Sequence, residues 1–137
     1  MALLLTIAPA AAAMAAQDTA PPPLRIELNR LEPREEGCRL WLILGNPGAE
    51  ALDPLRLDLV LFGRDGVVAR RLAVEAGPLP AEKTSARVLN LGATPCEAIG
   101  GVLLNDLLAC GPLPEGRAAC LARSAVFSRV PSVAFEK

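Results

Sequence analysis

Residues 55–75 read LRLDLVLFGRDGVVARRLAVE, two apolar stretches separated by the short sequence GRDG. Leucine stands at every second position of the first stretch, a period typical of a β-strand with one buried face. We therefore expect the four leucines to face the core, with Arg56 and Asp58 on the opposite face. The core-facing set is Leu55, Leu57, Leu59 and Leu61. Between the strands, Asp65 suits a turn because its carboxylate accepts nearby backbone hydrogen bonds, and Gly66 tolerates a positive φ. The stretch predicts a β-hairpin.

Further short strands are expected on both sides of this hairpin. They are predicted at residues 24–31, 38–46, 55–62, 67–75, 84–91, 99–104 and 123–130. Glycine, proline and asparagine separate them, and no helix is predicted in this part beyond an irregular or helical turn leading to Cys110. Seven short strands with turn residues between them favour an all-β fold, an immunoglobulin-like antiparallel β-sandwich.

The composition is that of one globular domain without a nucleic-acid surface. The chain has 137 residues, of which 52% are hydrophobic and 21% charged, too apolar a balance for disorder. Only 3% are aromatic, so the core is expected to consist of Leu, Val, Ile and Ala. Few aromatic side chains are therefore present to stack on the bases of a nucleic acid. A net charge of −1 provides no global attraction for a phosphate backbone, so we expect no nucleic-acid partner.

The absence of histidine excludes several kinds of active site. No Ser-His-Asp or Cys-His system and no His-containing metal site can form. The best polar candidates for an enzyme are Asp58, Asp65, Asn105 and Asp106, and each is also explained by a strand exterior or a turn. We therefore expect a protein that is not an enzyme and has no catalytic, cofactor-binding or metal-binding residues.

The first sixteen residues resemble a secretory leader. Residues 2–16 are uncharged and apolar but short for a membrane span, which suits the central region of a signal peptide. Cleavage is expected after Ala15 or Ala16, followed by a Pro-rich spacer at 17–23 and the β-sandwich domain at 24–137. A positively charged start is missing, so either translation begins upstream or the run is a buried apolar helix. We expect a periplasmic protein with no stable membrane span after leader cleavage.

Four cysteines follow the leader, and no two of them form a C-x-x-C pair. They are Cys38, Cys96, Cys110 and Cys120. Four cysteines allow three pairings, and without histidine a zinc site would need all four, so disulfides are the better interpretation. We favour a Cys110–Cys120 bond across an exposed loop containing Gly111, Pro112, Pro114 and Gly116, and a Cys38–Cys96 bond between distant strands.

The stretch LVLFGRDGVV, residues 59–68, resembles the catalytic motif of haloacid-dehalogenase-like phosphatases. In that motif two aspartates flank one residue just after an apolar strand, and the first is the nucleophile. Here the aligned residues are Gly63, Arg64 and Asp65, so the nucleophile position is glycine. No phosphoaspartyl intermediate can form without that carboxylate. The hairpin is therefore the favoured interpretation.

Two further resemblances concern bacterial exported proteins. Residues 39–91 resemble the FxLYD-type immunoglobulin-like modules, with Phe62 at the position of the aromatic tyrosine and Gly63 at that of the turn aspartate. The whole chain, through GCRLWLILGN, GPLPAEKTS and GGVLLNDLLAC, is similar to proteins labelled Tat-pathway-signal-sequence domain proteins. The leader lacks a twin arginine, so this second resemblance implies an upstream start. Neither resemblance supplies a catalytic or ligand residue.

Two functional hypotheses follow. The first is a disulfide-stabilised module that binds another protein or envelope component through an exposed strand edge or through the loops at one end. The alternative is a redox or metal-handling accessory protein that acts through Cys110 and Cys120 in an exposed loop.

Overall fold

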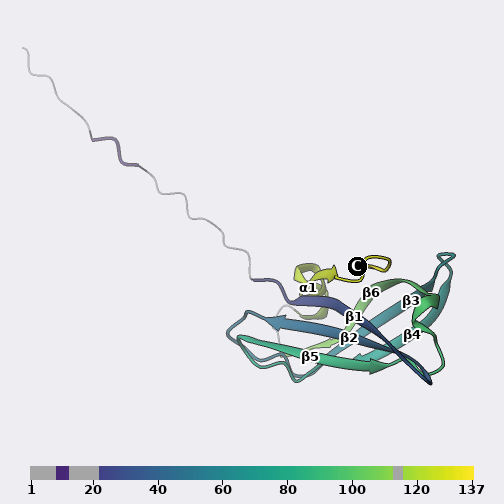
Figure 1. The fold of residues 1–137 in the computed structure, drawn as a ribbon. Coiled ribbons are helices and arrows are strands. Elements are labelled where there is room, and N and C mark those ends of the chain that lie inside the picture. The colour runs from purple at the N-terminus through teal and green to yellow at the C-terminus, as the bar shows by residue number, and fades with distance from the viewer. Residues whose placement is uncertain (1–8, 13–21, 113–115) are drawn as a thin grey trace, which may run out of the picture.

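The computed structural model describes residues 9–12, 22–112 and 116–137, which form two four-stranded sheets (Figure 1). The first sheet, in the order β5-β2-β1-β7, consists of β1 (Arg25–Arg34), β2 (Gly37–Asn46), β5 (Lys83–Asn90) and β7 (Ala125–Ser128). The second sheet, in the order β4-β3-β6-β8, consists of β3 (Leu55–Gly63), β4 (Val68–Glu75), β6 (Ile99–Cys110) and β8 (Ala134–Glu136). A short 3₁₀ helix η1 (Cys96–Ala98) precedes β6, and α1 (Gly116–Arg123) follows it.

The core lies between the two sheets and consists mainly of leucine. The four leucines predicted for the core face of β3 are all fully buried, and they meet the buried faces of β1 and β2. The fully buried set from β1 and β2 is Ile26, Leu28, Leu40, Leu42 and Leu44. All of the largest fully buried side chains are Leu or Ile, as the low aromatic content predicts. Alternation of leucine in the sequence therefore identified the inner face of β3 correctly.

The strand order confirms the predicted all-β sandwich. β2 pairs with β1 and β5, while β3 pairs with β4 and β6, so the chain crosses between sheets as in immunoglobulin-like folds. Two details differ from the prediction: the described residues form eight strands, and β7 and β8 pair parallel with β1 and β6. α1 lies in the connection that carries the chain from β6 in the second sheet to β7 in the first.

Strand β6 is longer than predicted, because two irregularities conceal its alternation. The expected strand ended at Leu104, but β6 continues to Cys110, with shifts in its register against β3 on either side of Asp106. Each extra residue moves the next core-facing position from two to three residues away. Leu104, Leu107 and Cys110 are therefore all buried at a spacing of three, which resembles a helical pattern in the sequence.

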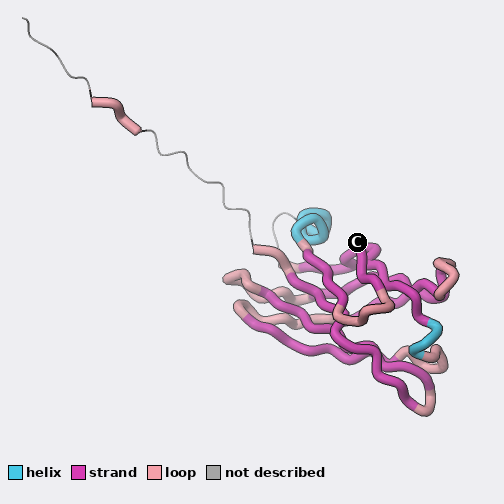
Figure 2. Tube along the Cα trace, turned by 45° about the horizontal axis from the view of Figure 1, so that its top comes forward, coloured by secondary structure: helices cyan, strands magenta, loops and turns pink. Residues whose placement is uncertain are grey.

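Helix α1 was not predicted. Its eight residues are too few to be stable alone, so tertiary contacts must hold it. Cys120 in α1 is bonded to Cys110 of β6, and Lys137 Nζ donates hydrogen bonds to the carbonyls of Leu121 and Ala122 at 3.0 and 2.8 Å. Figure 2 shows both helical segments at the periphery of the strands.

The predicted leader at 1–16 and spacer at 17–23 lie outside the described residues, except for 9–12 and 22–23. In the part of the chain that the structure describes, no helix has the length and apolar character needed to cross a membrane.

Candidate functional site

The GRDG stretch is the hairpin turn that the sequence predicted. The Gly63 amide donates to the Val67 carbonyl at 2.8 Å, and Gly66 adopts a positive φ of 78°. The Asp65 carboxylate accepts a hydrogen bond from the Val67 amide at 3.0 Å. Arg64 is held as well, because its Nε donates to the Glu97 carbonyl at 2.8 Å. Both polar side chains at this loop tip therefore have structural partners.

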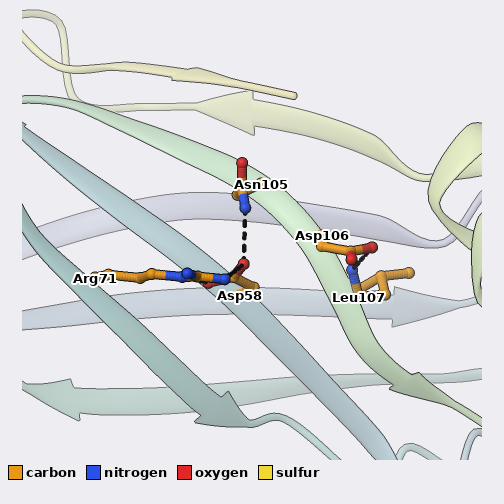
Figure 3. A network of polar contacts seen from close by, with 5 residues as sticks. All are labelled: Asp58, Arg71, Asn105, Asp106 and Leu107. Atoms are coloured by element: carbon orange, nitrogen blue, oxygen red, sulfur yellow. Dashed lines mark hydrogen bonds and ion pairs between the residues drawn. The ribbon is translucent and has the colours of Figure 1, made fainter.

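Asp58 lies on the outer face of β3, as the sequence predicted, but it is buried there by its neighbours. It is only 2% exposed, although it points away from the core between β4 and β6. Arg71 of β4 donates to both carboxylate oxygens at 2.8 and 2.7 Å, and Asn105 of β6 donates to Oδ2 at 2.8 Å (Figure 3). The hydrogen bonds from Arg71 lower the pKa of Asp58, against the opposing effect of burial. A carboxylate held ionised and fully engaged in this way is suited to a structural role.

Of the four polar candidates, the fold brings Asp58 beside Asp106, its strand partner on β6, and beside Asn105. The irregular pairing of β6 turns the Asn105 side chain toward Asp58, while the Asp106 carboxylate accepts a hydrogen bond from the Leu107 amide at 2.8 Å and makes no hydrogen bond to Asp58 in Figure 3. Asp65 lies in the hairpin turn at the end of β3. These residues do not form one catalytic cluster.

The cysteines form the two disulfides that the sequence favoured, Cys38–Cys96 and Cys110–Cys120. The second bond is not in an exposed loop, which corrects that expectation, because Cys110 and Cys120 are 4% and 0% exposed. Pro114 of the predicted loop lies outside the described residues. A buried sulfur pair is poorly placed for thiol exchange, which requires direct attack by an incoming thiolate.

A hollow of about 580 Å³ lies on the outer face of the first sheet. Its lining residues are Arg25, Glu27, Asn29, Ile43, Gly45, Thr84 and Arg129. A second hollow of about 340 Å³ shares Arg25, Gly45 and Thr84 and adds Asn46, Pro47, Glu82 and Lys83. We call these two hollows together the sheet-face trough. Each is of the size that small ligands or single side chains occupy.

Strand register explains why the trough is hollow. Gly45 of β2 lies opposite Arg25 of β1 and Thr84 of β5, so the middle strand has no side chain at this level. A Cβ added to Gly45 would lie 3.6 Å from Arg25 Cβ and 3.8 Å from Thr84 Oγ1, which is ordinary contact. The trough therefore exists because position 45 is glycine, and the backbone there does not require glycine.

Two arginines are held at the trough in different ways. Arg129 Nε forms an ion pair with Glu27 at 2.9 Å, and the hydrogen bond from Asn29 to Glu27, followed by that from Arg129, lowers the pKa of Glu27. The Arg25 guanidinium lies 5.1 Å from the ring centre of Phe127. Among the described residues, no carboxylate lies within ion-pair distance of Arg25. Its charge is therefore available to an anionic ligand.

Sequence reasoning did not find the trough. Arg25, Glu27 and Asn29 lie close together in the sequence, but Arg129 is 102 positions from Glu27. Only the parallel pairing of β7 with β1 brings Arg129 beside that face. The single signal in the sequence is Gly45, a glycine within an otherwise apolar strand, which can mark a close approach of a ligand.

Comparison of the chain with protein-family models, with curated proteins and with solved structures finds no match.

Proposed function

We propose that this protein is a non-enzymatic, disulfide-stabilised binding module of the periplasm, and that it holds its partner in the sheet-face trough. The observation that carries the proposal is an open hollow lined by both polar and apolar groups on the outer face of a sheet, in which Arg25 forms no ion pair among the described residues. Binding sites are typically concave and have a few well-placed polar groups. The hydrogen bonds of Asp58, Asp65 and Asp106 support a structural role for each, and hence a role without catalysis.

The β4 edge is a less suitable docking surface than the trough. Arg70 lies opposite the buried Leu61, so it projects from the core-facing side of an edge strand. It donates a hydrogen bond to the carbonyl of Leu91, across the open side of the sandwich. An inward-pointing charge of this kind discourages the addition of another strand.

The β5 edge, which belongs to the first sheet, is protected in the same way by an inward-pointing arginine. Arg87 lies opposite the buried Leu42 and donates to the Pro78 carbonyl at 3.0 Å. At the other side of the sandwich the edge strands β7 and β8 have only four and three residues, which offer little backbone to a partner. These features favour recognition by the sheet face over recognition by an edge.

The periplasmic location rests on the apolar leader and on the disulfides. Two disulfides are compatible with an oxidising compartment and unusual in a reducing one. The resemblance to exported Tat-signal and FxLYD-type proteins supports the same location. Fractionation and mass spectrometry test it: we expect the protein in the periplasmic fraction, with its N-terminus at Ala16 or Gln17. An intact leader on cytoplasmic protein would contradict this part of the proposal.

A pair of glycine variants tests the binding site. Gly45→Val fills the trough, whereas Gly101→Val adds the same side chain to the outer face of the second sheet, where a Cβ also meets only ordinary contacts. We expect a cross-linked envelope partner to be retained by the wild type and by Gly101→Val and lost by Gly45→Val. Equal retention by both variants, with both folded by circular dichroism, would show that the trough is not the site.

A further inference from the structure

The outer face of the first sheet carries positive charge although the whole chain is slightly acidic. Strand pairing places Arg25, Arg30 and Arg39 on this face, and Arg129 joins it through its ion pair with Glu27. The acidic groups on the same strands are Glu27 and Glu32. Four cations against two anions leave an excess of two positive charges on a chain whose net charge is −1. A surface with this local excess favours an anionic partner.

Apolar side chains lie in the middle of the same face. Trp41 and Ile43 of β2 are half-buried there, between Val88 of β5, which is 45% exposed, and Phe127 of β7, which is 44% exposed. Aromatic residues and arginine together are the composition found at the energetic centres of protein interfaces. The partner should therefore have apolar side chains beside its acidic groups.

The guanidinium groups at the trough are positioned before any ligand arrives. Arg25 stacks on Phe127, and Arg129 is fixed by Glu27. A planar guanidinium binds a carboxylate through two parallel hydrogen bonds, and a side chain that is already ordered loses less entropy on binding. The floor at Gly45 leaves room for a side chain to enter between Arg25 and Thr84.

We propose that the sheet-face trough binds an acidic, partly apolar segment of another polypeptide, with a carboxylate on Arg25 and apolar side chains on Ile43 and Phe127. This inference rests on the proposed function and names its partner class. The concave shape favours a chain over a flat anionic bilayer, because a narrow segment can enter the trough and a bilayer surface cannot. Its two hollows share three lining residues and are therefore adjacent, which suits an extended segment that contacts both.

Trp41 is the single tryptophan of the chain and lies on this face, so its fluorescence reports binding. The probes are a short acetylated peptide of alternating Glu and Leu, the same peptide with Gln in place of Glu, and vesicles of phosphatidylglycerol and phosphatidylethanolamine. We expect the Glu peptide to bind at least about tenfold more tightly than the Gln peptide, a difference of about 1.4 kcal/mol in binding free energy. Its affinity should fall as the salt concentration is raised.

Two arginine variants provide the matched control. Arg25→Gln and Arg56→Gln remove the same charge, but Arg56 lies on the second sheet in an exposed ion pair with Glu75. We expect Arg25→Gln to lower the affinity for the Glu peptide at least about tenfold and Arg56→Gln to leave that affinity unchanged. Equal effects of the two variants, equal binding of the two peptides, or binding to vesicles without binding to peptide would each overturn the inference.

The failure of this inference can be told apart from failure of the proposed function. If Gly45→Val abolishes capture of the envelope partner while the two peptides bind equally, the trough is a binding site and only the acidic character of its partner is wrong. If Gly45→Val changes neither capture nor peptide binding, the proposed function itself is wrong.

Discussion

Asp58 and Arg71 form a two-point ion pair across β3 and β4, in which the carboxylate is 2% exposed and the arginine side chain 67% exposed. The arginine thus covers a carboxylate on the outer face of a sheet while its own far side stays in water. Asn105, turned by the irregular pairing of β6, completes the set of donors. This arrangement gives Asp58 a structural role on the outer face of the second sheet.

Removing Arg71 should destabilise the fold. Arg71→Met leaves the Asp58 carboxylate buried with only Asn105 as a partner, so we expect the free energy of unfolding to fall by about 1–3 kcal/mol. Arg56→Met is the control, because its ion pair with Glu75 is exposed on both sides and should contribute about 0–1 kcal/mol. Urea denaturation of both variants measures the difference, and equal losses would contradict the role of Asp58 as a buried charge.

Stability should depend on pH through Asp58. Its pKa is lowered in the folded state, chiefly by the hydrogen bonds from Arg71, so the unfolded chain takes up the proton first as pH falls. The contribution of Asp58 is therefore fully present above the ordinary aspartate pKa of about 3.9 and is lost as pH falls through the lower folded value. Asp58→Asn should flatten the stability profile below about pH 4. An unchanged slope in urea titrations at several pH values would disprove this.

The two disulfides should contribute unequally to stability. They close loops with sequence separations of 58 and 10 residues, and the loss of unfolded-state entropy grows with loop length. We expect Cys38→Ala/Cys96→Ala to cost about 4 kcal/mol and Cys110→Ala/Cys120→Ala about 3 kcal/mol. Denaturation of the two double variants gives the order. A reversed order would indicate that packing around Cys120 contributes more to stability than the difference in unfolded-state entropy between the two loops.

Asn46, the last residue of β2, should be sensitive to substitution. Its buried amide donates to the carbonyls of Glu50, Leu79 and Pro80 at 2.8, 3.3 and 3.1 Å, so it joins two loops. Asn46→Ala removes all three of these hydrogen bonds and should cost about 1–3 kcal/mol. Asn90→Ala removes only an exposed turn contact and should cost less than about 1 kcal/mol. Thermal unfolding of the pair tests the contrast.

The inward-pointing arginines should keep the chain monomeric. Arg70→Val/Arg87→Val removes both charges from the edges of β4 and β5, which then present apolar edge strands to one another. We expect self-association that increases with protein concentration. Sedimentation velocity measures it, with Arg56→Val/Arg64→Val as a control for the loss of two charges. A monomeric edge variant would show that other features protect the edges.

Much of the fold followed from local pattern. Alternating leucines identified the core face of β3, because a strand that buries one face must place apolar residues at every second position. Asp65 and Gly66 identified the hairpin, because few residues tolerate that turn. The number and placing of cysteines led to the correct disulfide pairs. The strands and the turn depend on residues that are close in sequence, and the disulfides depend on cysteine, a residue type that is used mainly for such bonds in exported proteins.

The tertiary structure alone decided the rest. The register irregularities of β6 gave its apolar residues a helix-like spacing and turned Asn105 toward Asp58, so the sequence alone did not reveal that the carboxylate is buried. The trough depends on Arg129 reaching a strand 102 positions earlier, through a parallel pairing that local pattern cannot specify. Periodicity shows which face of a strand is buried, but which strands become neighbours, and hence which charges meet, is determined by the packing of the whole chain.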